Sequence, residues 1–213
     1  MRLSARRSLA RRCATLCLCL VLLVLALGSC AKRSTAPALD DIYDEVVSLI
    51  ERSYAVNDVV LGHGLPTWEI GSDYAERMRM YPSNSYADYE NVTPYAPYTS
   101  IGELKQAMEE VYSSDYLSSI YVTLFDGFVG ATGVVRAQLA ESEGGLRQSV
   151  SAEPLLEGRR IYDYSTMRIV SPSSADYVTV ELESHLEHEA DTLTVRLGLT
   201  LERDGWRLDT PTY

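Results

Sequence analysis

The stretch from Asp191 to Leu208 constrains the fold of this chain more than any other part of the sequence. Apolar residues occupy every second position along it: Leu193, Val195, Leu197, Leu199 and Leu201. A period of two residues predicts a β-strand with one buried face and one open face. Arg203-Asp204-Gly205 then predicts a tight hairpin turn, after which Trp206 and Leu208 resume the apolar face. The stretch therefore predicts two consecutive antiparallel strands.

Turn signals divide the rest of the second half into further segments of this kind. The predicted strands are Val134–Ala140, Leu146–Ala152, Ile161–Val170, Tyr177–Leu186, Leu193–Glu202 and Trp206–Asp209. Together they predict an antiparallel meander. Leu197 is expected at the centre of its core, on the same face as Val180 and Val195. Gly198 lies in the middle of a strand, which predicts a bulge or bend in a curved sheet.

Helical patterns precede the strands. The first helix is expected from Asp40 to about Asn57, where apolar residues recur at intervals of three and four. The second opens at Ser100, which has capping-box spacing with Glu103. The third follows Ser113-Ser114 and ends at Gly127. Helices followed by a meander predict an α+β fold, with N-terminal helices packed on a curved antiparallel sheet in a single domain, residues 40–213.

The first 30 residues read as a leader. Five arginines form a basic region, and the apolar run Ala14–Leu27 is shorter than the roughly 20 residues of a membrane span. The run ends in Leu27-Gly28-Ser29-Cys30, which resembles a bacterial lipobox. We therefore expect a lipoprotein signal peptide at residues 1–29, diacylglycerol on Cys30, a tether at residues 30–39 and attachment to the outer face of the cell membrane. Ordinary secretory cleavage or an uncleaved anchor is the alternative, and the general secretory and twin-arginine routes both remain open.

Cysteine placement and charge restrict the function of the remaining chain. All four cysteines, Cys13, Cys17, Cys19 and Cys30, lie in the leader or at its end, so the predicted domain has no disulfide, no cysteine zinc site and no cysteine nucleophile. The whole chain has 19 basic and 30 acidic residues, and removal of the five leader arginines leaves 14 against 30, a net charge of −16. Such a domain repels nucleic acid and attracts cationic proteins. The alternative is that the charge serves only solubility.

Two surface features are candidates for partner contact. The segment Trp68–Tyr98 is rich in tyrosine, which supplies contact area with a polar tip, and the turn between the last two long strands is rich in acids. The predicted contact residues are Tyr81, Tyr86, Tyr89, Glu187, Glu189 and Asp191. The alternative for the tyrosine segment is a long loop pinned to the fold by its rings.

No catalytic, cofactor-binding or metal-binding residue is assigned. The sequence contains no phosphate-binding loop, dinucleotide fingerprint or Gly-x-Ser-x-Gly motif. His63 lies between two glycines, as a loop residue does. Glu183, His185 and Glu187 would share a strand face and form at most a weak divalent-cation site, because His188 points the other way. The candidates for catalysis in a cone-shaped domain are Tyr162, Asp163 and Tyr164, which exposed strand positions also explain.

Two segments carry a resemblance to a known family. They are Tyr98–Lys105 running on to Val111-Tyr112-Ser113, and the ending Gly205–Tyr213. Together they resemble the IseA-type DL-endopeptidase inhibitors of Gram-positive bacteria. The resemblance implies a cystatin-like cone that docks on cell-wall hydrolases with a cysteine–histidine centre. Gly205-Trp206-Arg207 also resembles the ending of SnoaL-like and ketosteroid-isomerase-like cones.

We therefore expect a membrane-tethered, non-enzymatic protein that binds and inhibits a cell-wall peptidase. Members of the inhibitor family are secreted, so the lipobox favours a tethered role over a freely diffusing one. The alternative is a small-molecule-binding or catalytic cone. The two hypotheses differ in whether the concave face of the sheet is open and lined by ionisable groups, or filled by aromatic side chains.

Overall fold

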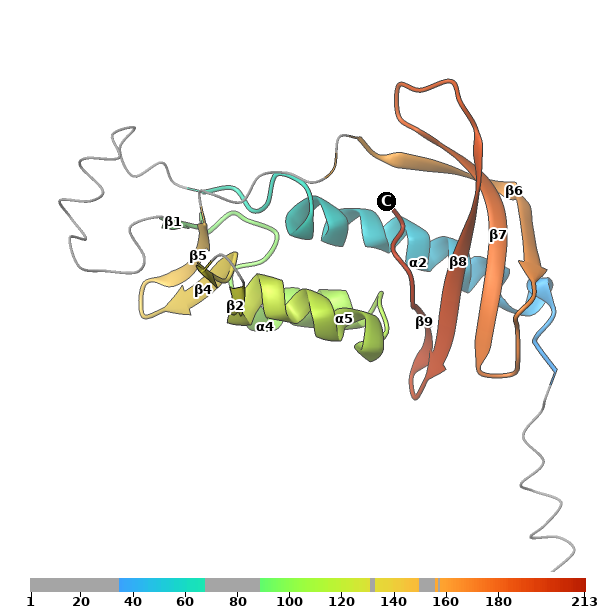
Figure 1. Ribbon diagram of the computed structural model, residues 1–213, viewed down its shortest axis with the longest axis horizontal. Helices are drawn as coiled ribbons and strands as arrows, with labels where there is room; N and C mark the ends of the chain where they lie inside the picture. The colour runs from blue at the N-terminus through green and yellow to red at the C-terminus, as the bar shows by residue number, and fades with distance from the viewer. Residues whose placement is uncertain (1–34, 68–88, 131–132, 150–155, 157) are drawn as a thin grey trace, which may run out of the picture.

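The computed structural model describes residues 35–67, 89–130, 133–149, 156 and 158–213. Cys30, Tyr81 and Tyr86 lie outside these residues. The described chain is α+β, with helices and three antiparallel sheets (Figure 1). None of its helices combines the length and the apolar character that crossing a membrane requires.

The long helix α2, Leu39–Val60, confirms the first predicted helix and extends it by one turn at its C-terminal end. Its buried stripe contains Ile42, Val46, Leu49, Ile50, Val56, Val59 and Val60. Ser53 and Asn57 are buried on the same stripe. Polar groups in such positions need hydrogen-bond partners from elsewhere in the chain.

The predicted meander is confirmed for the last four of its six strands, which form an antiparallel sheet in the order β6-β7-β8-β9, whereas the first two predicted strands lie outside this sheet. Its strands are β6 (Arg160–Val170), β7 (Tyr177–Leu186), β8 (Leu193–Glu202) and β9 (Gly205–Leu208). Leu197 pairs with Val180, and both are buried, as the alternation predicts. Leu193 and Leu201, at the two ends of β8, are 58% and 45% exposed. Only the middle of the strand therefore contributes to the core.

Helix α2 crosses one face of this sheet, which we call the inner face (Figure 1). The phenol of Tyr54 donates to the carbonyl of Arg160 at 2.9 Å, and the amide of Trp206 donates to the Glu45 carboxylate at 2.9 Å. Gly205 has φ +135°, and a Cβ there would lie 2.8 Å from the same carboxylate. Because Gly205 has no side chain, the Glu45 carboxylate of α2 can reach the Trp206 amide of β9.

The inner face is filled by aliphatic side chains. They include Val46, Leu49 and Ile50 of α2 and Val178, Val180, Leu182, Leu197, Leu199 and Leu208 of the sheet, each at most 2% exposed. Close packing of this kind leaves no space for a ligand between helix and sheet.

The prediction of a bulge at Gly198 is wrong. Pairing between β7 and β8 is regular through Thr179 and Gly198, and the irregularity of the sheet falls in β6, between Asp163 and Arg168. A Cβ at residue 198 would lie 2.6 Å from the Tyr177 hydroxyl oxygen. The glycine makes room for the Tyr177 side chain on the outer face.

Helices α4 (Ile101–Glu109) and α5 (Ser114–Tyr121) confirm the second and third predicted helices. Ser100 caps α4, but the Glu103 carboxylate accepts from the Thr99 amide at 2.7 Å, one residue before the expected partner. Beyond α5 the chain continues as the π-helical turn η1 (Val122–Asp126). The connection between α4 and α5 joins β9, because the Ser113 amide donates to the Leu208 carbonyl at 2.8 Å.

The predicted strand Val134–Ala140 is wrong, because two separate strands occupy this region. Strand β3 (Gly133–Val135) pairs with β2 (Phe128–Gly130), and β4 (Leu139–Ser142) lies in the three-stranded sheet β1-β5-β4. The other two strands of that sheet are β1 (Tyr89–Asn91) and β5 (Gly145–Ser149). The break falls at Gln138, whose amide donates to the Thr123 carbonyl at 3.2 Å and so leaves the strand ladder.

Candidate functional site

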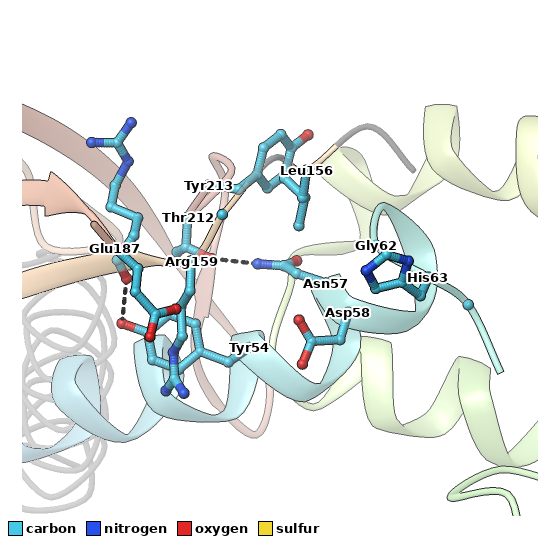
Figure 2. Close-up of a pocket in the computed structure, with 13 residues that line it drawn as sticks. Tyr54, Asn57, Asp58, Gly62, His63, Leu156, Arg159, Glu187, Thr212 and Tyr213 are labelled. Carbon is cyan, nitrogen blue, oxygen red and sulfur yellow. Dashed lines mark hydrogen bonds between the residues drawn. The ribbon is translucent and has the colours of Figure 1, made fainter. Parts of the chain in front are cut away.

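A polar cleft of about 430 Å³ lies at the C-terminal end of α2 (Figure 2). Three segments meet there: the last turns of α2, the first residues of β6 with the end of β7, and the last residues of the sequence. Its charged lining residues are Asp58, Arg159, Arg160 and Glu187, and His63 lines it as well. We call it the α2 cleft.

The floor of the α2 cleft is a buried hydrogen-bond network. Asn57 and Thr212 line the cleft and are 5% and 1% exposed. The Tyr112 hydroxyl donates to Asn57 Oδ1 at 2.7 Å, and Asn57 Nδ2 donates to Thr212 Oγ1 at 2.9 Å. Ser53 Oγ lies 2.6 Å from Thr212 Oγ1 and donates to the Ile50 carbonyl at 2.6 Å.

This network has a direction. Because the Ser53 proton goes to Ile50, Thr212 must donate to Ser53. Each side chain therefore donates a hydrogen bond to the next, from Tyr112 to Asn57, from Asn57 to Thr212 and from Thr212 to Ser53. Burial raises the pKa of Tyr112, which keeps the phenol protonated as the first donor. In the described part of the chain the second Nδ2–H of Asn57 has no hydrogen-bond partner.

One wall of the cleft is formed by Arg159 and Tyr54. The Arg159 guanidinium lies 3.6 Å from the centre of the Tyr54 ring, and its Nη2 lies 3.7 Å from Glu51 Oε2. Ring and carboxylate together fix a side chain that is still 48% exposed. Burial, and then the negative charge of Glu51, raise the pKa of Tyr54. The wall therefore presents a positioned cation beside a neutral phenol.

Arg160 lies beside it, at the first position of β6. It is half-buried, and its Nη1 donates to the hydroxyl of Ser184 at 3.1 Å. Among the described residues no carboxylate forms an ion pair with Arg160. A guanidinium that is partly withdrawn from water with only a neutral partner is a favourable site for an anion.

Asp58 and Glu187 bring negative charge to the cleft. Both are exposed, and within the described ranges neither carboxylate has a hydrogen bond or an ion pair. Figure 2 shows Asp58 and His63 at one end of the cleft and Arg159 and Glu187 at the other. His63 is exposed in the Gly62-His63-Gly64 turn that ends α2, as the sequence predicts.

The predicted acidic turn is the connection between β7 and β8, which projects beyond the end of the sheet (Figure 1). Glu187, Glu189 and Asp191 are all exposed there. His188 has φ +76°, and the Glu189 amide donates to the Leu186 carbonyl at 2.9 Å, so the backbone turns within this acidic loop. The structure thus brings Glu187 to both the acidic loop and the α2 cleft.

Tyr89 is a wrong prediction as a surface contact. It is only 6% exposed in β1, and its hydroxyl donates to the carbonyl of Ala137. Its polar tip fixes the β1-β5-β4 sheet, which is the alternative that the sequence left open for the tyrosine segment. Tyr81 and Tyr86 cannot be placed, because they lie outside the described residues.

The candidates for catalysis in β6 separate in the structure. Asp163 is exposed and accepts from the Ser165 hydroxyl at 2.6 Å, as expected for an open strand position. Tyr162 is 7% exposed, so an exposed position is wrong for it, and burial raises its pKa. Tyr164 is half-buried and donates to Glu51 at 2.5 Å. The three side chains do not meet in one pocket.

Histidines and acids do not come together as metal ligands in the described part of the chain, where no group of three or more His, Cys, Asp or Glu has suitable geometry. The predicted set of Glu183, His185 and Glu187 is therefore not brought together.

Sequence reasoning missed Arg159, Arg160, Asn57 and Thr212 as site residues. One signal was present, because Ser53 and Asn57 interrupt the apolar stripe of α2 with an i, i+4 pair of polar residues. Such a pair on a buried face predicts a polar partner, but it does not identify Thr212. No family model matches this chain, and no curated protein matches it.

Proposed function

We propose that this chain is a lipid-anchored extracytoplasmic protein whose domain binds a cationic protein partner at the cell wall, and that the partner is a cell-wall peptidase that it inhibits. The anchor rests on Leu27-Gly28-Ser29-Cys30. The kind of partner rests on the resemblance of residues 98–113 and 205–213 to the inhibitor family. Two backbone hydrogen bonds, from the Ser113 amide to the Leu208 carbonyl and from the Leu208 amide to the Val111 carbonyl, make these two segments neighbours.

One observation carries the choice of binding over catalysis: the inner face of the sheet is filled. A helix across a four-stranded antiparallel sheet fits the cystatin-like cone that we propose for the fold. Cone enzymes need reactive groups in an open space between helix and sheet, and here that space holds Leu49, Ile50 and Leu197, each at most 2% exposed. The filling is mainly aliphatic, with Trp206 and Tyr162 also buried, and it favours recognition on the outside of the fold.

The acidic loop is the contact surface that we propose. The loop projects from the end of the sheet (Figure 1), and its three acidic residues are exposed. The net charge of the domain after loss of the leader is 14 − 30 = −16. Charges at the rim of an interface act mainly by accelerating encounter with a partner of opposite sign. Tyr81 and Tyr86 remain proposed contacts, and Tyr89 is withdrawn because it is buried.

The test is inhibition of purified cysteine-type cell-wall peptidases from the same cell by the soluble domain, residue 31 onward, over a salt series. We expect inhibition at low salt and an association rate that falls as salt rises, because a Debye length of about 10 Å at 0.1 M screens exposed charges. Absence of both binding and inhibition at low salt would contradict the proposal.

Charge placement is tested with two triple variants. Glu187→Gln, Glu189→Gln and Asp191→Asn together should slow association about tenfold, with little change in dissociation. The matched control removes three acids near the opposite end of the sheet, by Glu109→Gln, Glu110→Gln and Asp204→Asn. Equal slowing in both variants would show that only net charge matters and that the acidic loop is not the contact surface.

A second candidate function, small-molecule binding, is favoured by the α2 cleft. The cleft is independent of the filled inner face, and its volume of about 430 Å³ lies within the usual range for ligand sites.

A further inference from the structure

Four charged side chains line the α2 cleft, and their charges cancel. Arg159 and Arg160 contribute two positive charges, and Asp58 and Glu187 contribute two negative charges. In the part of the chain that the structure describes, these arginines form no ion pair with these acids, although Arg159 pairs with Glu51 outside the cleft. The cleft thus keeps both signs of charge available to a ligand.

We propose that the α2 cleft binds a small zwitterion, namely a short peptide of about two residues, with its carboxylate at Arg160 and its ammonium group at Asp58. Arg160 is half-buried with only the Ser184 hydroxyl as a side-chain partner, so a carboxylate there supplies the missing charge. Asn57 also lines the cleft, and its Nδ2 carries a second N–H besides the one that it donates to Thr212.

Ligand length follows from the chemistry of the two charged groups. Arg160 and Asp58 belong to different elements that line the same cleft, the start of β6 and the last turns of α2. A single amino acid carries its ammonium group and its carboxylate on one carbon atom, whereas two extended residues span about 7 Å from end to end. A short peptide can therefore reach two separated charges that a single amino acid cannot reach together.

The same charges select against other anions. A phosphate or a polyanion gains from the two arginines but is repelled by Asp58 and Glu187. A zwitterion satisfies both signs at once. This inference needs no protein partner and does not depend on the proposed function, and Glu187, which borders both surfaces, is left unchanged in its test.

The experiment is isothermal titration calorimetry on the full chain in a non-ionic detergent. The probes are dialanine, N-acetyl-dialanine without the ammonium group, dialanine amide without the carboxylate, and inorganic phosphate. We expect dialanine to bind about tenfold or more tightly than either blocked form, because each loses a charged hydrogen-bond partner. Phosphate is expected to bind more weakly than dialanine.

Two variants test whether Arg160 binds the carboxylate of the ligand and whether Asp58 binds its ammonium group. Arg160→Gln should weaken dialanine about tenfold or more, whereas Arg168→Gln, on the outer face of the same strand, should leave binding unchanged. Asp58→Asn is at an exposed helix position where folding is not at stake. It should remove the preference for dialanine over N-acetyl-dialanine.

Three outcomes would overturn the inference. They are the absence of dialanine binding at millimolar concentration, equal binding of dialanine and its blocked forms, and a stronger response to phosphate than to dialanine. If Arg160→Gln fails to fold, Asp58→Asn decides: an unchanged preference for the free amino group would also overturn it.

Discussion

Glu181 is a carboxylate on the outer face of the sheet that two arginines enclose from the neighbouring strands. Arg168 Nε lies 3.0 Å from one carboxylate oxygen and Arg196 Nε lies 2.7 Å from the other, and Glu181 itself is only 6% exposed. Hydrogen bonds from Arg168, and then from Arg196, lower its pKa. Strands β6, β7 and β8 are thus joined by side chains as well as by backbone.

Substitution of Glu181 by Gln should make stability depend less on pH. A lowered folded-state pKa means that the carboxylate stabilises the fold above its unfolded pKa of about 4.5 and loses this effect as pH falls through the folded value. We expect urea unfolding to show wild type more stable than Glu181→Gln at pH 7, with the difference vanishing well below pH 4.5. An identical difference at both pH values would contradict the role of the charge.

Strand β8 carries two leucines, one buried and one exposed, that form a matched pair for testing the register of the sheet. Leu197 is 2% exposed at the centre of the strand, and Leu193 is 58% exposed at its start. Leu197→Asp would bury an unpaired charge and should cost roughly 3–5 kcal/mol of unfolding free energy. Leu193→Asp should stay within about 0.5 kcal/mol of wild type. Thermal and urea unfolding of both variants measure this, and similar losses would contradict the register of the sheet.

Elements with strong periodicity were predictable from the sequence, and short ones were not. Strands β7 and β8 have ten residues each and lie in the predicted ranges, because alternation repeats often enough to identify their buried face. Strands β1, β2 and β3 have three residues each, too few to show a period. Such short strands depend on contacts with distant residues, such as the hydrogen bond from the Tyr89 hydroxyl in β1 to the Ala137 carbonyl.

The candidate site was less predictable because its residues come from distant parts of the chain. The acidic loop is a local cluster in the sequence, and it was found. In the α2 cleft, Asp58 and Arg160 belong to a helix and a strand that meet only in the folded state. No local spacing connects them, so neither periodicity nor motifs predict that these residues line the same cleft.

For the molecule as a whole, the attachment to the membrane that we propose depends on Cys30. The Leu27-Gly28-Ser29-Cys30 sequence predicts acylation of this cysteine. We expect Cys30→Ala to move the protein from the membrane fraction to the soluble fraction, and we expect mass spectrometry of the wild type to show a lipid on the N-terminal cysteine. One acyl group gives only marginal membrane binding, whereas two or more hold a protein stably. A variant that stays equally membrane-bound would contradict the anchor.

The hydrogen bonds between α2 and Thr212 also limit when the fold can be completed, because they cannot form until Thr212 has been synthesised. Asn57 and Ser53 precede Thr212 by 155 and 159 residues, and both are buried on the apolar face of α2. Synthesis at 5–20 residues per second separates their appearance by on the order of ten seconds. During that time Asn57 and Ser53 lack Thr212 as a partner, although Ser53 can already donate to the Ile50 carbonyl, so burial of the apolar face of α2 is less favourable than in the finished domain. The network below the α2 cleft is completed only when Thr212 has been made, and under the export that we propose this interval keeps that part of the fold open.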